Sequence, residues 1–229
     1  MVSASSRPDG RSAGAAGTLP PKERILAAAL EIFRELGFDA ATMRQITDRA
    51  HVNLAAANYY FGSKDELIRQ VLERMTAPYV AARLAALDAC EQAAGDAPPA
   101  LEAVVEAIVR PTVLLSRDPD GGRALIRLLL QVRARPRDAT VGFFIEQMDP
   151  AVHRFIAALS RALPGMSRAS LFWRYNFALG ALVQVLTDAD PGSLRLKRQS
   201  GGLCNTDDDE TIIAQLVAFI TAGFRGAEP

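Results

Sequence analysis

The chain has few of the residues on which catalysis and metal binding most often depend. It contains 2 cysteines and 2 histidines among 229 residues. Cys90 and Cys204 are too far apart in sequence to form a metal-ligand pair, and we expect both to stay thiols in a reducing compartment. The sequence also lacks a glycine-rich phosphate loop and a G-x-S-x-G nucleophile elbow. We therefore predict no enzyme activity, no cofactor and no metal site.

An excess of charge of one sign is also absent, because 26 basic residues balance 26 acidic residues. Any surface for nucleic acid must therefore be a local patch. No segment has the apolar run of a signal peptide, and none is long and apolar enough to cross a bilayer. We expect a cytoplasmic protein that makes no membrane contact.

The apolar residues, 49% of the chain, recur mainly at helical spacing. No segment alternates with the period of a strand for long, so we predict an all-α fold of about nine helices. The expected organisation is a flexible N-terminal arm, a three-helix DNA-binding module and a larger helical ligand-binding and dimerisation domain, over residues 1–19, 20–66 and 67–229. Pro78, Pro111 and Pro150 fall inside predicted helices and should bend them.

Short local patterns predict where other elements begin and end. Gly37 is a natural left-handed C-cap and should end the first helix. Ser63 and Glu66 have the spacing of a capping box, which predicts a new helix from Lys64. A helix is predicted over 123–133, and the segment from 190 to about 207 should be loose.

The stretch from Thr42 to Lys64 has the most specific pattern. Thr42 and Gln45 have the spacing of a capping box, which predicts the start of a helix. Asn53 is a good N-cap for a second helix, and Val52 lies between the two helices, where one apolar side chain can fill the angle. Two short helices joined by such a turn are typical of a helix-turn-helix, whose second helix enters the major groove of DNA.

The second helix has small and polar residues where a DNA-reading helix needs them. Three alanines, residues 55–57, permit close approach, and Asn58 can pair with adenine. Arg44, Arg49 and Lys64 oppose Asp48, which gives a local charge of 3 − 1 = +2 with His51 neutral. An ordinary helical hairpin with a polar surface remains the alternative. The residues expected at DNA are Thr42, Arg44, Asn53, Leu54, Ala55, Asn58, Tyr59, Tyr60 and Lys64.

The last two long helices are apolar over more than one face, which exceeds what a helix wet on one side needs. The surplus predicts burial against a second copy of the chain. A two-fold dimer also suits a helix-turn-helix, which reads two half-sites of DNA. A monomeric core is the alternative. The predicted interface consists of Ala178, Ala181, Leu182, Val185, Ile213, Leu216 and Ile220.

The middle of the chain offers apolar helices interrupted by prolines, and the gaps between such helices can hold a ligand. For each residue singly, core packing or a solvated face is the simpler interpretation. The candidate pocket residues are Arg127, Phe143, Gln147, Met148, Trp173 and Phe177.

The segment AHVNLAAANYYFGSKDEL resembles the end of the DNA-binding domain of the TetR/AcrR family of bacterial regulators. The departures are Asn58, where the family often has Tyr, Tyr60, where it often has His, and Ala55, where it often has Gly. The resemblance implies a dimer formed by the last two helices, a phosphate contact by Lys64 and a ligand pocket in the larger domain. Two further segments, SLFWRYNFALGALVQVL and AFITAGFRGAE, are similar to the fatty-acid-responsive PsrA-like branch.

We therefore expect a ligand-responsive DNA-binding transcriptional regulator. The resemblance implies a homodimeric repressor that leaves a palindromic, double-stranded operator when a small apolar effector, such as a long-chain acyl compound, binds. Activation rather than repression stays open. The alternative from another class is a helical small-molecule-binding or scaffold protein that does not bind DNA.

Overall fold

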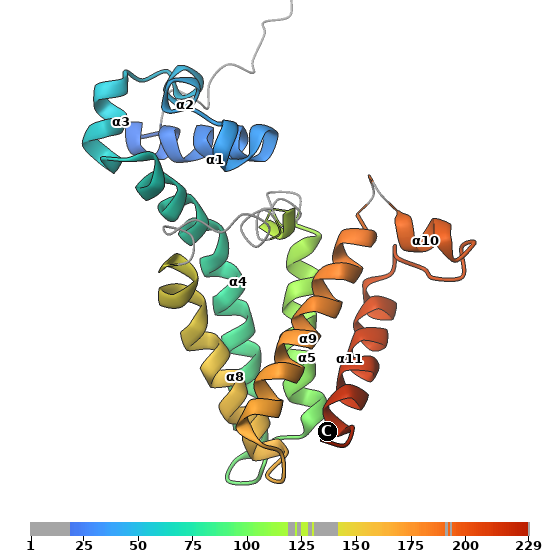
Figure 1. The fold of residues 1–229 in the computed structure, drawn as a ribbon. Helices are drawn as coiled ribbons and strands as arrows, with labels where there is room; N and C mark the ends of the chain where they lie inside the picture. The colour runs from blue at the N-terminus through green and yellow to red at the C-terminus, as the bar shows by residue number, and fades with distance from the viewer. Residues whose placement is uncertain are drawn as a thin grey trace, which may run out of the picture. The chain divides into compact units, whose positions relative to one another are not determined.

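The computed structural model describes residues 19–118, 122, 125–127, 130, 142–190, 192 and 194–228. Every regular element within these ranges is a helix, and none is a strand, as Figure 1 shows. This confirms the predicted all-α fold. The chain divides into two compact units, residues 1–71 and 72–229.

The first unit contains three helices and the first turns of a fourth. They are α1 (Pro21–Ala40), α2 (Met43–Ala50), α3 (Leu54–Phe61) and the beginning of α4 (Lys64–Ala94). Ile25, Phe33, Ile46 and Phe61 are buried where these helices pack on one another. Gly37 has a φ of 78°, a left-handed conformation that interrupts α1 at the position predicted for its end.

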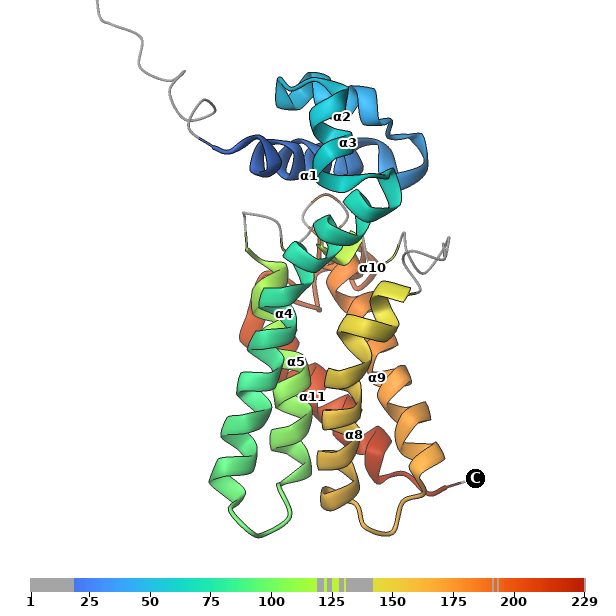
Figure 2. The ribbon, with the colours of Figure 1, turned by 90° about the vertical axis from the view of Figure 1, so that its left-hand side faces the viewer.

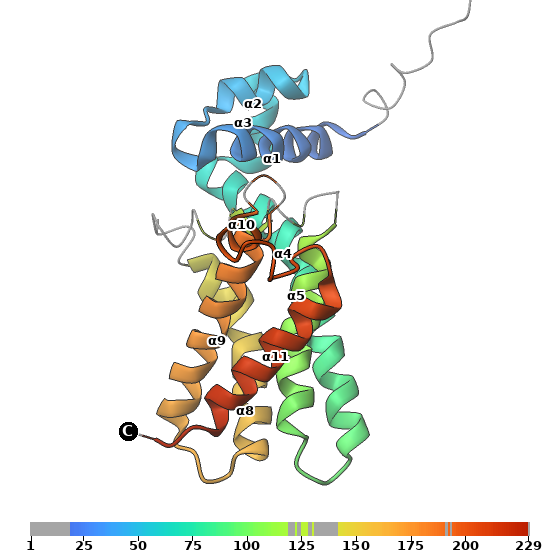
Figure 3. The same ribbon diagram turned by 90° about the vertical axis from the view of Figure 1, so that its right-hand side faces the viewer.

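The second unit is a bundle of the rest of α4 with α5 (Leu101–Ser116), α8 (Asp149–Ala162), α9 (Arg168–Asp188) and α11 (Asp209–Arg225). Figure 2 shows α8 beside α9, and Figure 3 shows α11 crossing α5. The apolar faces of these helices meet in one core that includes Ile108, Phe155, Leu182 and Leu216. Pro78 and Pro111 lie inside α4 and α5, and neither divides its helix.

Two expectations for the second unit need correction. Pro150 lies in the first turn of α8, where its missing N–H costs nothing, and a π-helical turn, η1 (Phe144–Met148), precedes it. The segment that we expected to be loose before the last helix contains a short helix, α10 (Arg195–Gln199). The predicted N-terminal arm, apart from Leu19, and most of the helix predicted over 123–133 lie outside the described residues. No helix within the described ranges has the length and hydropathy to span a bilayer.

Candidate functional site

The turn between α2 and α3 is built by the capping interactions that the sequence predicts. The Gln45 backbone N–H donates to Thr42 Oγ1 at 3.2 Å, and the Thr42 N–H donates to Gln45 Oε1 at 2.8 Å. At the other end of α2, His51 has a left-handed φ of 53° and its N–H donates back to the carbonyls of Thr47 and Asp48. Three residues, 51–53, therefore turn the chain between the helices.

One face of α3 is held in the first unit and the other is open. Asn53 Oδ1 accepts from the Ala56 N–H at 2.8 Å, which confirms the predicted N-cap. Ala57 and Phe61 are buried, one turn apart on the inner face. Leu54, Ala55, Asn58, Tyr59 and Tyr60 are exposed. α3 therefore presents a ridge of polar and small side chains while its apolar side chains fix its orientation.

The two tyrosines at the end of α3 differ in their surroundings. The Tyr59 side chain is 83% exposed, whereas Tyr60 is 37% exposed. Their ring centroids lie 5.2 Å apart in an edge-to-face arrangement, and the Tyr60 ring in turn lies 6.4 Å from that of Phe61. The Tyr60 ring thus packs against its aromatic neighbours, and the Tyr59 side chain is the more exposed of the two.

The arginines of α2 differ in their ion-pair partners. Arg44 is exposed, and its guanidinium has no ion pair with another described residue. Arg49 instead pairs with Glu31 at 3.1 Å and with Glu35 at 3.3 Å, which ties α2 to α1. These carboxylates raise the pKa of Arg49, the hydrogen bond to Glu35 most. Our count of Arg49 as free positive charge therefore needs correction.

Lys64, the first residue of α4, makes a hydrogen bond within this unit. Its ammonium donates to the carbonyl of Asp39 at 3.3 Å, close to the end of α1. The Lys64 side chain is half-buried, so part of its stem packs while the charged group stays near the surface. A phosphate contact by Lys64 would be made from this position.

The start of α4 carries half of the capping box that we predicted there. Ser63 Oγ accepts from the Glu66 N–H at 3.1 Å, but the Glu66 carboxylate does not return to Ser63. It instead accepts from Arg69 and Gln70, each at 2.8 Å, because these residues are one turn further along the helix. The hydrogen bond from Arg69 chiefly lowers the pKa of Glu66 from 4.5 to about 2.

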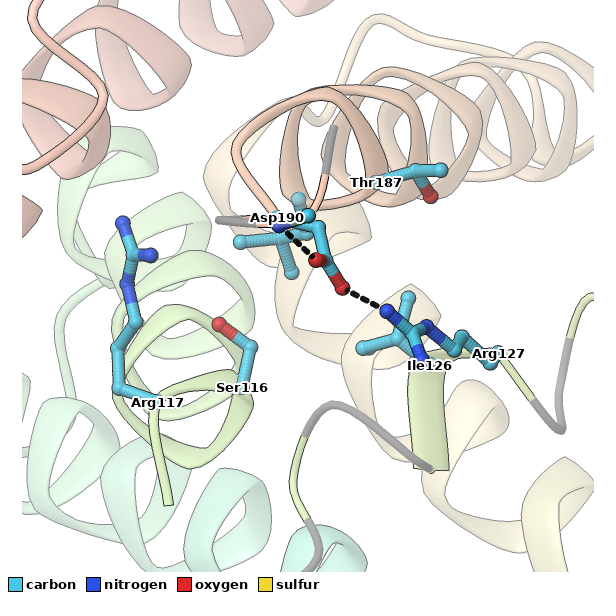
Figure 4. Close-up of a pocket in the computed structure, with 8 residues that line it drawn as sticks. Ser116, Arg117, Ile126, Arg127, Thr187 and Asp190 are labelled. Atoms are coloured by element: carbon cyan, nitrogen blue, oxygen red, sulfur yellow. Dashed lines mark hydrogen bonds and ion pairs between the residues drawn. The ribbon is translucent and has the colours of Figure 1, made fainter. Parts of the chain in front are cut away.

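A cavity of about 350 Å³ in the second unit includes one of the predicted pocket residues, Arg127 (Figure 4). Arg127 Nη2 donates to the Asp190 carboxylate at 2.7 Å, so its charge is already balanced there. Polar groups of α5 and α9 form much of the wall. The lining residues are Ser116, Arg117, Ile126, Arg127, Leu186, Thr187, Asp190 and Gly192.

The other five predicted pocket residues are not gathered around this cavity. Phe143 is buried, Met148 is half-buried and Gln147 is exposed. Trp173 and Phe177 are each 63% exposed, on one outer face of α9, with their ring centroids 5.8 Å apart. The structure therefore places these two aromatic rings on the surface of the chain rather than in its interior.

Most of the predicted dimer residues lie in the core of this chain. A side chain that is already buried has almost no area left to cover against a partner, so these five serve the core: Ala178, Leu182, Ile213, Leu216 and Ile220. Ala181 and Val185 are half-buried. The outward faces of α9 and α11 instead present Trp173, Phe177 and Phe219, together with Gly180 and Ala222.

Ala181 and Val185 line an apolar groove of about 590 Å³ between α9, α10 and α11. Leu196, Leu203 and Phe219 contribute to the same groove, and Phe219 is 68% exposed. The exposed Phe219 of α11 lies at this groove, so the outer surface of α9 and α11 combines a protruding aromatic side chain with an apolar groove.

Two arginines of the second unit have positions that the sequence pattern did not indicate. The Arg174 guanidinium donates to the carbonyls of Gly223, Phe224 and Gly226 at 2.7–2.9 Å and so caps the end of α11. Arg83 is buried, which we did not predict. The available signal was its spacing: Tyr79, Arg83 and Leu87 are four residues apart, and all three are buried.

Both units match family models. Residues 25–71 match the model described as bacterial regulatory proteins, tetR family, and residues 106–223 match the Tetracyclin repressor-like, C-terminal domain. The chain belongs to the TetR family. Proteins of this family are DNA-binding transcriptional regulators that take up ligands and act as dimers, so the exposed face of α3 belongs to the DNA-binding helix-turn-helix.

Two relatives match short segments of this chain. The chain is 50% identical over 46 residues to the HTH-type transcriptional dual regulator CecR of Shigella flexneri, across 20% of each protein. It is 39% identical over 66 residues to the HTH-type transcriptional regulator RutR of Escherichia coli, across 27% of this chain and 31% of RutR. The matched segments thus span less than a third of these relatives.

The fold extends further than these sequence matches. The crystal structure of a TetR-like transcriptional regulator from Rhodococcus aligns with 90% of this TetR-family chain and 99% of its own, with a TM-score of 0.58 and 20% sequence identity. At this identity the likeness concerns the fold alone. Both the helix-turn-helix unit and the helical second unit are therefore of TetR type.

Proposed function

We propose that this TetR-family protein is a cytoplasmic repressor that binds a palindromic operator with α3 and leaves it when a small apolar effector binds the second unit. The observation that carries the proposal is the division of α3 into a fixed inner face and an open outer face. Ala57 and Phe61 hold the helix, while Asn58 and Tyr59 project from it. Such a helix can enter the major groove without losing its packing.

We assign the DNA contacts from the positions of the side chains. Asn58, Tyr59 and Ala55 form the part that faces base edges, because their side chains are exposed along α3. The Asn53 oxygen is occupied by its cap, so Asn53 is assigned to phosphate through its amide N–H groups, together with the exposed Arg44. Tyr60 and Lys64 follow at the end of α3. Leu54 begins α3, and Thr42 caps the start of α2.

The proposed dimer forms through the outward faces of α9 and α11. Trp173, Phe177 and Phe219 are large apolar side chains left exposed on adjacent helices, and Gly180 and Ala222 beside them permit close approach. A two-fold axis at this surface pairs each helix with its copy. Such symmetry lets two α3 helices read half-sites about 34 Å apart on one side of the DNA.

Effector binding alters DNA binding through helix α4. This helix begins with Lys64 in the first unit and continues to Ala94 in the second. An effector that binds better to one arrangement of the second unit shifts the population toward it, and α4 carries that change to α3. The similarity of the last helices to the PsrA-like branch supports a long-chain acyl compound as the effector.

The proposal is tested with fluorescently labelled DNA fragments that flank the protein's own gene. We expect nanomolar binding to one fragment in the presence of excess competitor DNA, and release by an acyl compound but not by a short-chain analogue. Binding that competitor DNA removes completely would contradict operator recognition. Operator binding that persists through the whole acyl series would contradict only the effector assignment.

A further inference from the structure

Within the part of the second unit that the structure describes, one guanidinium lies in the interior. Arg83, on α4, is 3% exposed. Its Nη1 donates to the Tyr79 hydroxyl at 3.1 Å and its Nη2 donates to the Tyr175 hydroxyl at 2.7 Å. Its Nε–H is buried and has no acceptor among the residues that the structure describes. The hydrogen-bonding capacity of this side chain is therefore incompletely used.

Aromatic rings surround the same guanidinium. Its central carbon lies 4.6 Å from the centroid of the Phe155 ring, 5.3 Å from that of Tyr79 and 6.0 Å from that of Tyr175. These residues come from α8, α4 and α9 respectively, so three helices form one cage. Aromatic faces attract a cation, but they leave its positive charge without a counter-ion.

Arg83 has no carboxylate partner among the described residues, which distinguishes it from other arginines of this unit. Arg110, Arg117 and Arg154 each pair with a carboxylate at 2.6–2.7 Å. For Arg83 the hydrogen-bonding partners among the described residues are two tyrosine hydroxyls. Arginine does not lose its proton inside proteins, and a buried charge without a partner is costly. A buried charge that destabilises the folded chain in this way is explained if the charge binds an anionic ligand.

We propose that Arg83 is the anchor for a carboxylate carried by the otherwise apolar effector, an inference that rests on the effector-responsive function proposed above. The free Nε–H supplies a directed hydrogen bond, and the Tyr79 hydroxyl has a hydrogen of its own to donate. One positive charge matches one carboxylate rather than a doubly charged phosphate. The rings of Phe155 and the two tyrosines supply the apolar wall on which the body of the effector packs.

The position of Arg83 also connects the anchor with the DNA-binding unit. Arg83 and Lys64 lie on the same helix, α4. Because Arg83 is 3% exposed where α4, α8 and α9 pack, a carboxylate reaches it only when α4 moves relative to α8 or α9. Binding of the anion therefore selects a different placement of α4, which is the requirement for a ligand that alters DNA affinity.

The test compares matched ligands that differ only in charge. Straight-chain carboxylates from octanoate to hexadecanoate, and the alcohols of the same length, are titrated into the full-length protein by calorimetry. The wild type is expected to prefer each carboxylate over its alcohol by about 10- to 100-fold, the range of a charge-assisted hydrogen bond. Arg83→Met should abolish that preference and leave alcohol binding unchanged, whereas Arg83→Lys should keep part of it.

Two controls separate binding from folding. Arg154→Met removes a charge from the same unit at an exposed position, and this variant should keep the full preference. If Arg83→Met does not fold, the side-chain Nε–H resonance of Arg83 in the wild type gives the answer. That resonance should shift with dodecanoate and stay in place with dodecanol.

Three results would overturn the proposal. They are equal affinity of the wild type for carboxylates and alcohols, no binding of either series at millimolar concentration, and an unchanged preference for carboxylates in Arg83→Met. Operator binding by the ligand-free wild type is measured separately. Loss of operator recognition with an intact carboxylate preference contradicts the regulatory function alone. Intact operator recognition without that preference contradicts the role of Arg83 alone.

Discussion

Asn53 holds the start of α3 through its side chain, whose Oδ1 accepts from the backbone N–H of Ala56 at 2.8 Å. This bond occupies the oxygen with which an asparagine would pair to adenine. Asn58, one turn further along and exposed, has no such bond to another described residue. Two asparagines on one short helix therefore have separate roles, one in positioning the helix and one in reading DNA.

Asn58→Ala should weaken operator binding by about 1–3 kcal/mol, because a paired base edge loses its partner. Binding to a scrambled duplex should stay the same. Fluorescence anisotropy with both duplexes at one salt concentration measures the difference. Asn53→Ala serves as the comparison, because loss of the cap should destabilise the helix by about 1 kcal/mol and weaken binding to both duplexes. An unchanged operator affinity for Asn58→Ala would place Asn58 away from the bases.

Lys64→Ala should weaken binding to every DNA sequence and lower the slope of log affinity against log salt by about 1. The reason is that one phosphate contact, and the counter-ion that it releases, is lost. Arg154→Ala is the matched control, since it removes an exposed charge from the second unit and should leave the slope unchanged. A slope for Lys64→Ala equal to that of the wild type rules out the phosphate contact.

A charge on the outer faces of α9 and α11 should dissociate the dimer. Ala181→Asp introduces a carboxylate into the apolar groove, and Phe219→Asp introduces one at a side chain that is 68% exposed, so the second change spares the core. Sedimentation velocity should show monomers for both variants. Leu114→Asp, at an exposed position on α5, is the control that should remain dimeric. Intact dimers of Phe219→Asp would refute this interface.

Glu66 should contribute to stability only above acidic pH. Its folded pKa, lowered to about 2 chiefly by the hydrogen bond from Arg69, lies below the ordinary value of 4.5. The contribution is therefore complete above about pH 4.5 and is lost as the pH falls toward 2. Because the pair is partly exposed, Glu66→Gln should cost under about 1 kcal/mol at neutral pH.

Urea denaturation of the wild type and Glu66→Gln across this pH range measures the effect of Glu66. The two unfolding midpoints should converge as the pH approaches 2. Asp48→Asn removes an exposed carboxylate from α2 and should keep the pH dependence of the wild type. A difference between wild type and Glu66→Gln that stays constant with pH would show that the ion pair does not stabilise the unit.

Local signals in the sequence predicted much of the helix-turn-helix. The capping box of Thr42 and Gln45, the N-cap of Asn53 and the left-handed Gly37 each depend on a few neighbouring residues, so their outcome can be read from a short stretch. The hydrogen-bond partners of Glu66 were harder to predict, because the Ser63 N–H and the side chains of Arg69 and Gln70 are all within reach of its carboxylate. The helical pattern of α10 was too short to stand out from its glycine- and serine-rich surroundings.

Patterns of neighbouring residues predicted less of the second unit. Apolar spacing marked Leu182, Leu216 and Ile220 as buried, but spacing alone does not say whether the same chain or a partner buries them. The interaction of Arg83 with Tyr175 joins residues 92 positions apart. Such a contact depends on how α4, α8 and α9 pack, and no local pattern specifies that packing.

Hydroxyl-radical footprinting on the DNA that flanks the protein's own gene tests the central claim most directly. The account predicts two protected half-sites in inverted repeat, centred about 34 Å apart on one face of the duplex, with protection lost in Asn58→Ala at protein concentrations that still protect with the wild type. Protection of a single site, or uniform protection along the fragment, would contradict a two-fold dimer that reads DNA through α3.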